Sequence, residues 1–277
     1  MKTVGRRRAL GQHFLRDSRI ARAIVELAGL TRDDLAVEIG PGTGSLTTFL
    51  AEAAGHLICL EVDETLIRRL EAKFSPAPNV EIRHADARRV LYEELRAFRP
   101  SPQGRLVVVG NLPYSVSKPI LFRLVEAGTA IDLMVLTLQK EVAERLVAGP
   151  GSKRYGSLSV LTQLVADVEI AFTIPPGAFT PPPLVESAVV RMTPLKAPRA
   201  SIGDEAFFRR VVKAAFGQRR KTLGNALSGG LALPARDVQE ALRASGIDPQ
   251  LRAESLTLSE FARLADQLKK GSEGTRP

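Results

Sequence analysis

The sequence predicts an α/β fold in which a mostly parallel sheet with helices on both faces is followed by a small all-helical domain. Short apolar runs alternate with amphipathic stretches from about residue 17 to residue 195, the pattern of strands alternating with helices. Four runs consist almost entirely of Val, Ile and Leu, as expected for parallel strands covered on both faces. After residue 198 only helical spacing continues.

The candidate strands occupy residues 35–40, 57–63, 80–85, 105–110, 133–138, 168–174 and 188–192. The helices expected between them occupy residues 45–54, 64–74, 87–98, 118–127, 140–147 and 157–166. The last two strands are joined by the loop PPGAFTPPPLVES, which is too short for a crossover helix. We therefore expect these two strands to form an antiparallel pair.

The C-terminal part of the chain has the spacing of a helical domain. Asp204 is a candidate cap for a helix whose apolar residues recur every three or four positions, and Gly217 ends it. Further helices are expected through 223–227, 237–244 and 259–269. The predicted domains are 1–198, which includes a basic N-terminal arm, and a helical domain, 199–277.

Composition excludes several classes of protein. The chain has 277 residues, of which 44% are hydrophobic, yet no apolar run has the eighteen or so residues that a membrane span needs. The N-terminus lacks the apolar stretch of a signal peptide, so a cytoplasmic protein is expected. The single cysteine, Cys59, lies in an apolar run and is interpreted as a buried hydrophobe. The three histidines lie apart in the sequence, so no metal site is expected.

The net charge of +9 is concentrated at the two ends of the chain. Residues 1–20 contain six Lys and Arg against one acid, and residues 197–277 contain fourteen against nine. The long middle contains nineteen against twenty. Basic ends on a near-neutral body favour a protein that holds a polyanion across its active site.

A glycine-rich loop follows the first strand, with the sequence EIGPGTG from Glu38 to Gly44. A dinucleotide fingerprint would need its third glycine at position 45, which is Ser45, and Pro41 removes a backbone donor that a pyrophosphate would use. The pattern E-x-G-x-G-x-G resembles motif I of Rossmann-like S-adenosylmethionine methyltransferases. Gly40 and Gly42 are therefore candidate cofactor-binding residues, because the backbone can pass closely under the ligand there.

Acidic residues end the next two strands. Glu61 lies twenty-one residues beyond Gly40 and would accept hydrogen bonds from both ribose hydroxyls of the cofactor. The alternative is a solvated acid at a strand end, with Asp63 capping the next helix. Asp86 follows the third strand and would accept from the adenine amino group of the cofactor.

The most specific feature is Asn111-Leu112-Pro113-Tyr114, directly after the fourth strand. An exocyclic aromatic amine is a poor nucleophile because its lone pair is delocalised into the ring. Two acceptors, the Asn111 side-chain oxygen and a backbone carbonyl at Leu112 or Pro113, would hold its N–H groups and direct the lone pair at a methyl group. Tyr114 would stack on the target base. The alternative is an Asn-Pro turn with a packed tyrosine.

With these residues and several further segments, the chain resembles the ribosomal RNA adenine dimethyltransferase family over roughly residues 5 to 265. The further segments are 11–15 (GQHFL), 138–142 (LQKEV), 155–159 (YGSLS), 178–183 (AFTPPP), 185–190 (VESAVV) and 216–223 (FGQRRKTL). The resemblance implies S-adenosylmethionine-dependent N6,N6-dimethylation of two adjacent adenines in the 3′-terminal hairpin of small-subunit (16S) rRNA. It also implies a role in small-subunit biogenesis, with small-subunit rRNA in a pre-ribosomal particle as the partner. It further implies that domain 1–198 is the S-adenosylmethionine-dependent methyltransferase and that the helical domain 199–277 binds RNA. We expect a monomer.

The family also implies that His13 and Leu15 contact the methionine end of the cofactor, alongside Gly40, Glu61, Asp86 and Asn111. Many members carry Asn where this chain has His13; a histidine still donates a hydrogen bond, but its tautomer and charge then matter.

Three other features have two interpretations each. Phe179 would face Tyr114 across a flipped adenine, or it packs in the protein interior. Arg219, Arg220 and Lys221, at the start of a helix, would contact phosphates, or they form a solvated turn. The same alternatives hold for the N-terminal arginines Arg6, Arg7 and Arg8.

Three rival functions remain. The first is the related methylation of one adenine in large-subunit rRNA, which confers macrolide resistance and uses a similar Asn-x-Pro-aromatic loop. The second is a non-catalytic RNA-binding assembly factor. The third is a nicotinamide oxidoreductase. It is the weakest, because the chain lacks the third glycine that a dinucleotide fingerprint would need at position 45.

Overall fold

The computed structural model describes residues 13–218 and 220–274. Their contacts divide the chain into two compact units. One consists of the chain up to Ala143 together with Ala166–Lys196, and the other of Glu144–Val165 together with the chain from Ala197 onward. This division differs from the predicted boundary after residue 198 in one segment, because residues 144–165 group with the C-terminal helices.

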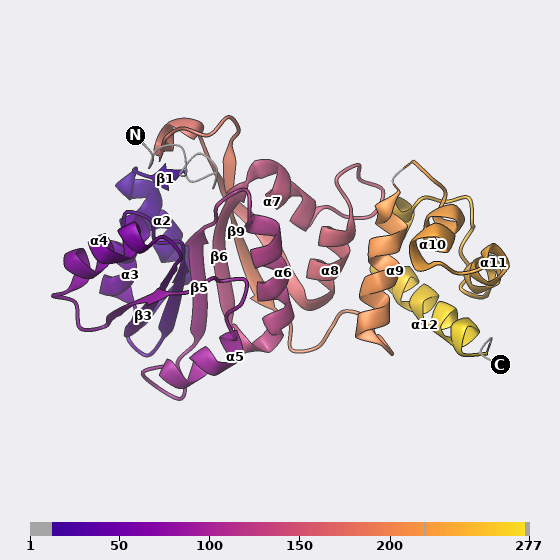
Figure 1. Ribbon diagram of the computed structural model, residues 1–277, viewed down its shortest axis with the longest axis horizontal. Coiled ribbons are helices and arrows are strands. Elements are labelled where there is room, and N and C mark those ends of the chain that lie inside the picture. Colours follow the sequence, from indigo (N-terminus) through magenta and orange to yellow (C-terminus); the bar gives the residue numbers. More distant parts are fainter. Residues whose placement is uncertain (1–12, 219, 275–277) are drawn as a thin grey trace. The chain divides into compact units, whose positions relative to one another are not determined.

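The first unit contains a seven-stranded sheet in the order β4-β3-β2-β5-β6-β9-β7 (Figure 1). The strands β2 to β6 are parallel, whereas β9 is antiparallel to both of its neighbours, β6 and β7. All seven predicted strands and the antiparallel pair are thus confirmed. Their bounds are β2 (Leu35–Ile39), β3 (His56–Glu61), β4 (Val80–His84), β5 (Leu106–Asn111), β6 (Leu133–Gln139), β7 (Ala166–Ile174) and β9 (Ser187–Pro194).

Helices cover the sheet because its central strands are apolar on both faces. On β5, Val107 and Val109 lie in the core cluster that includes residues of α2 and α3, and the alternate residue Val108 is equally buried. The helices of this part of the chain are α2 (Ser18–Ala28), α3 (Ser45–Ala53), α4 (Glu64–Phe74), α5 (Tyr92–Leu95), η1 (Arg96–Phe98), α6 (Ser117–Ala127), η2 (Gly128–Ala130) and α7 (Lys140–Val147).

Two helix predictions are informative. Asp63 caps α4 by accepting from the Thr65 N–H, as expected. The predicted helix at 87–98 is wrong in length, because α5 begins only at Tyr92 and continues as a short 3₁₀ turn. The residues before it form a turn in which Arg89 N–H donates to the Asp86 carbonyl, and Pro100 follows the 3₁₀ turn closely.

A second, two-stranded sheet joins the start of the described chain to the loop between β7 and β9. β1 (Phe14–Leu15) pairs antiparallel with β8 (Phe179–Thr180), which follows η3 (Pro176–Ala178). The Arg16 N–H extends this pairing by donating to the Ala178 carbonyl. The strand β1 is thereby fixed beside the carboxyl edge of the main sheet, near the top of Figure 1.

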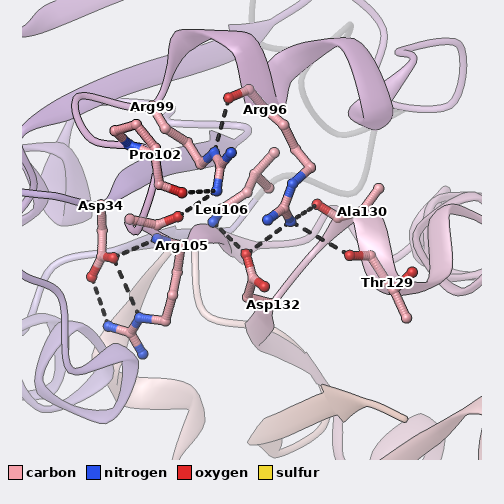
Figure 2. Close-up of polar contacts among 10 residues, drawn as sticks. Asp34, Arg96, Arg99, Pro102, Arg105, Leu106, Thr129, Ala130 and Asp132 are labelled. Carbon is pink, nitrogen blue, oxygen red and sulfur yellow. Dashed lines mark hydrogen bonds and ion pairs between the residues drawn. The ribbon is translucent and has the colours of Figure 1, made fainter. Parts of the chain in front are cut away.

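At the opposite, amino edge of the sheet, two carboxylates secure the beginning of β5 (Figure 2). Asp34 accepts from both the backbone and the guanidinium of Arg105, each at 2.7 Å. Asp132 accepts from the Leu106 N–H at 2.7 Å and from Arg96 at 3.0 Å. Burial works to raise the pKa of Asp34, but the hydrogen bonds from Arg105 lower it overall.

The second unit is helical. It contains α8 (Ser157–Val165), α9 (Glu205–Gly217), α10 (Leu223–Leu231), α11 (Ala235–Ala244), η4 (Ala253–Ser255) and α12 (Leu258–Gly274). Asp204 caps α9, as predicted, by accepting from the Phe207 N–H, and it also pairs with Lys269. Phe216 packs between Tyr155 and Phe261 with ring centroids 5.9 and 5.6 Å away. Within the described residues, no helix is long and apolar enough to cross a membrane.

Candidate active site

The loop between β2 and α3 is shaped by its glycines. Gly40, Gly42 and Gly44 have φ angles of 67°, 59° and 81°, which L-residues with side chains rarely adopt. A Cβ on Gly42 would lie 2.7 Å from the Phe14 ring, and one on Gly40 would project 4.0 Å from both the Asn111 carbonyl and the Pro113 ring. The loop therefore presents bare backbone to the cavity between these residues.

One pocket brings together eight of the residues singled out in the sequence. It is lined by His13, Phe14, Gly40, Gly42, Glu61, Asn111, Leu112, Pro113 and Tyr114. They come from β1, from the glycine loop and from the carboxyl ends of β3 and β5, so four separate segments meet at one edge of the sheet. Phe14 is the one lining residue that the sequence analysis did not single out, although it stands inside the GQHFL segment.

Glu61 presents a buried carboxylate at this edge. Its side chain accepts from the backbone N–H groups of Val62 and Asp63 at 2.8 and 3.0 Å. Burial raises the pKa of Glu61, and these hydrogen bonds act in the opposite direction. The backbone of Gly42 acts on the carboxylate in the same direction. A carboxylate offers about four lone-pair sites, so Glu61 retains acceptor capacity for a ligand.

Glu38 is a polar residue of this region to which the sequence analysis assigned no role. It is 1% exposed and accepts from Thr47 Oγ1 at 2.6 Å and from Cys59 Sγ at 3.5 Å. It lines a small cavity behind the glycine loop together with Leu15 and Asn111. Burial raises the pKa of Glu38 to about 7. Its signal in the sequence was the acidic first position of the E-x-G-x-G-x-G pattern. Cys59 is buried, as predicted.

Asn111 is held by its amide nitrogen, which donates to the His13 backbone carbonyl at 2.7 Å. Among the described residues no donor contacts its Oδ1, which leaves that oxygen for a ligand. The next residues are fixed as well, because the Leu112 N–H donates to the Thr137 carbonyl and the Pro113 carbonyl accepts from the Val116 N–H, each at 3.1 Å. The Asn-Leu-Pro-Tyr segment therefore has a defined conformation at the end of β5.

Tyr114 is partly buried and is restrained from two sides. Its hydroxyl lies 2.5 Å from Ser187 Oγ, and its ring centroid lies 5.2 Å from that of His13. The His13 ring is itself held, because its Nδ1 lies 2.8 Å from the Pro181 carbonyl. A neutral or protonated imidazole with hydrogen on Nδ1 satisfies this contact.

Three other predicted site residues lie outside the pocket lining. Leu15 is buried behind the glycine loop, where Ser45 Oγ donates to its carbonyl. Asp86 is engaged by the Arg88 guanidinium, which lowers its pKa. Phe179 is 2% exposed and belongs to the core cluster with Leu15, so its position favours the packing interpretation.

The basic residues predicted to contact RNA are only partly described. Arg220 and Lys221 are exposed, and the Lys221 N–H donates to the Gln218 carbonyl in the turn before α10. Arg6, Arg7, Arg8 and Arg219 lie outside the described residues. No group of described His, Cys, Asp and Glu side chains has the arrangement of a metal site.

Comparison with known proteins identifies similar chains along nearly the whole length. Residues 5–270 match the model of the family described as ribosomal RNA adenine dimethylase. The chain is 45% identical over 263 residues to the ribosomal RNA small subunit methyltransferase A of Geobacter sulfurreducens, covering 95% of each chain. It is 41% identical over 264 residues to the protein of the same name from Alkaliphilus oremlandii, covering 95% of this chain and 92% of that one.

Two solved structures share the fold. The 23S rRNA methyltransferase ErmE has a TM-score of 0.65 and 27% identity, with 92% of this chain and 99% of that chain covered. A dimethyladenosine transferase from Plasmodium falciparum has a TM-score of 0.73 over 94% of this chain and 98% of that chain, and its 23% identity shows the fold alone.

Proposed function

We propose that this chain, which belongs to the ribosomal RNA adenine dimethylase family, transfers methyl groups in the pocket at the carboxyl edge of its sheet. It is an S-adenosylmethionine-dependent rRNA adenine dimethyltransferase. The observation that carries the proposal is the juxtaposition of Asn111, Tyr114 and Glu61 around the bare backbone of the glycine loop. A non-catalytic assembly factor would not need an Asn amide held with its oxygen toward a pocket.

The residues present fit S-adenosylmethionine, which supplies an electrophilic methyl group on its sulfonium. The glycine loop offers backbone without Cβ atoms, and a side chain at Gly40 would fill the space between Asn111 and Pro113. Glu61 would accept from the ribose hydroxyls. His13 and Leu15 would flank the methionine end, and Asp86 would accept from the adenine amino group after exchanging its bond with Arg88.

The chain's own part in the chemistry is orientation. The target N6 amine donates one N–H to Asn111 Oδ1 and the other to a backbone carbonyl. Because the Pro113 carbonyl already accepts from Val116, the Leu112 carbonyl is the stronger candidate for the second acceptor. Tyr114 stacks on the base, and the amine's lone pair then points at the methyl group. Transfer would break the bond between sulfur and the methyl carbon and leave S-adenosylhomocysteine. The N-methylated cation that results is acidic enough to lose its proton to water, so no general base is required.

We assign the substrate as two adjacent adenines in the 3′-terminal hairpin of small-subunit rRNA, within a pre-ribosomal particle. The relatives named as small subunit methyltransferases, at 41% and 45% identity, support this over the large-subunit alternative represented by ErmE at 27%. The enzyme is proposed to act in the cytoplasm as a monomer. A second transfer can follow once the spent cofactor has been exchanged for S-adenosylmethionine, because no acid or base of the pocket is consumed by the first.

The assignment is tested with unmodified small- and large-subunit particles and labelled cofactor. Nuclease digestion and mass spectrometry should show N6,N6-dimethyladenine at two neighbouring adenines of small-subunit rRNA. Monomethyladenine as the sole product at saturating cofactor, or modification confined to large-subunit rRNA, would overturn it.

Arg220 and Lys221, with Arg219 and Arg6–8, are proposed to contact RNA phosphates. Replacing both Arg220 and Lys221 by Ala should lower the slope of log affinity against log salt by about two, since each phosphate contact contributes roughly one. Arg236→Ala is the matched control, because Arg236 is an exposed arginine of α11 paired with Glu240. A slope equal to that of the control would identify the pair as a solvated turn.

A further inference from the structure

The first residue of strand β9, Ser187, contacts the active-site residue Tyr114. Because β9 runs antiparallel to β6, its beginning lies beside the carboxyl end of β6, where Ser187 stands opposite Gln139. Ser187 is 0% exposed, so its hydroxyl has no access to water. That hydroxyl lies 2.5 Å from the Tyr114 hydroxyl, and the two form a short hydrogen bond. No role follows for Ser187 from the sequence motifs of the pocket.

Tyr114 is restrained at three points along its length. Ser117 Oγ donates to its backbone carbonyl at 3.2 Å, and the His13 ring lies against its side. Ser187 holds the far end of the phenol. Without the last contact the backbone and the side of the ring would still be held, but the far end of the phenol could move as the side chain turns about χ1.

The loop that leads into β9 is itself attached at both ends. At its start, the Pro181 carbonyl contacts the His13 imidazole at 2.8 Å. At its finish, the Glu186 carbonyl accepts from the Lys140 N–H at 3.0 Å, and the two side chains form an ion pair. Ser187 therefore stands on fixed backbone, which a positioning group needs if it is to restrain another side chain.

We propose that Ser187 is a positioning residue for methyl transfer, which fixes the direction of the Tyr114 side chain through the hydroxyl pair so that the ring receives the target adenine at a single place. This inference rests on the proposed stacking role of Tyr114. A misaligned base moves its amine away from Asn111, and methyl transfer depends steeply on that alignment. Ser187 does not line the cofactor pocket, and the Tyr114 ring that does is kept when the hydroxyl pair is removed, so cofactor affinity should change far less than the methylation rate.

The test removes one of the two hydroxyl groups at a time. Ser187→Ala and Tyr114→Phe should each lower the single-turnover methylation rate of unmodified small-subunit particles by about five- to tenfold at saturating enzyme. The double variant should be no slower than the slower single variant, because both changes delete the same bond. The dissociation constant for S-adenosylmethionine, measured by calorimetry on the free enzyme, should stay within about twofold of the wild type.

Two controls separate the possible outcomes. Ser245→Ala deletes another buried serine hydroxyl, bonded at 2.7 Å to the Ala241 carbonyl in the helical unit, and should leave the rate unchanged. Tyr114→Ala removes the ring itself; if it methylates at the wild-type rate, the proposed function of Tyr114 fails. If Tyr114→Ala is slow while Ser187→Ala and Tyr114→Phe are as fast as the wild type, only the role of Ser187 is overturned. Additive losses in the double variant would also overturn it.

Discussion

Strand β5 begins and ends in two polar environments that differ in how completely their groups are used. At its beginning, Asp34 and Asp132 each accept from both a backbone N–H and an arginine (Figure 2). At its end, Asn111 lines the pocket and uses its amide nitrogen internally, while no donor among the described residues contacts its oxygen. The polar groups at the amino edge are therefore satisfied within the protein, whereas the carboxyl edge keeps the acceptor that we propose binds the target amine, although the strand that joins the two is only six residues long.

The largest effect is expected from Asn111→Ala, which removes the acceptor at the carboxyl edge. The methylation rate should fall by roughly 10²–10³-fold, because a preorganised group that acts on the reacting centre is lost. Cofactor affinity should fall far less. Single-turnover rates and calorimetry check this, and a rate near that of the wild type would remove Asn111 from the orienting role.

Glu38→Gln tests whether the buried negative charge of Glu38 at the carboxyl edge destabilises the folded protein. The pKa of Glu38 is raised from 4.5 to about 7 in the folded chain, so its contribution to stability is fully present below pH 4.5 and is lost as pH rises through 7. The variant should therefore be more stable than the wild type at pH 8, by up to about 3 kcal/mol, and no more stable at pH 4. Urea unfolding at both pH values measures the difference; an equal shift at both would contradict it.

Glu61→Ala should weaken S-adenosylmethionine binding by about 1.5–3 kcal/mol, since hydrogen bonds from the ribose hydroxyls to a charged group are lost. The free energy of unfolding should change little by comparison. Titration calorimetry gives the affinity, and an unchanged value would show that Glu61 serves only to hold the backbone of Val62 and Asp63.

At the amino edge, Asp34→Asn should lower the free energy of unfolding by about 1–3 kcal/mol at pH 7 and leave cofactor affinity unchanged. The lowered pKa of Asp34 means that its contribution is present above pH 3.8 and is lost as pH falls through the folded-state pKa. The deficit should therefore shrink in acid, opposite in sign to the behaviour of Glu38. A loss of cofactor affinity without a loss of stability would contradict the separation of the two edges.

The sequence predicted this separation only in part. The strands and the Asn111–Tyr114 motif were predictable because apolar runs mark parallel strands and their ends share one edge. Phe179 was not, because its burial depends on pairing between β1 and β8, and a proline run carries no information about a partner strand. Asp86 was given a ligand as partner, whereas in this structure Arg88, two residues away, engages it. Glu38 could be identified as the first residue of the glycine-loop motif. Its burial could not be predicted, because it depends on contacts with Thr47 and Cys59 that form only in the fold.

The pairing of β1 with β8 also determines when the pocket can form during synthesis. His13 holds Asn111, 98 residues further along the chain, and contacts Pro181, 168 residues further. Contacts of such separation close late, because the chain entropy of a long loop must be lost first. A nascent chain that has just completed β5 contains the glycine loop, Glu61 and Asn111, but not the strand that fixes His13. The cofactor pocket therefore remains unfinished until the chain as far as Pro181 has left the ribosome.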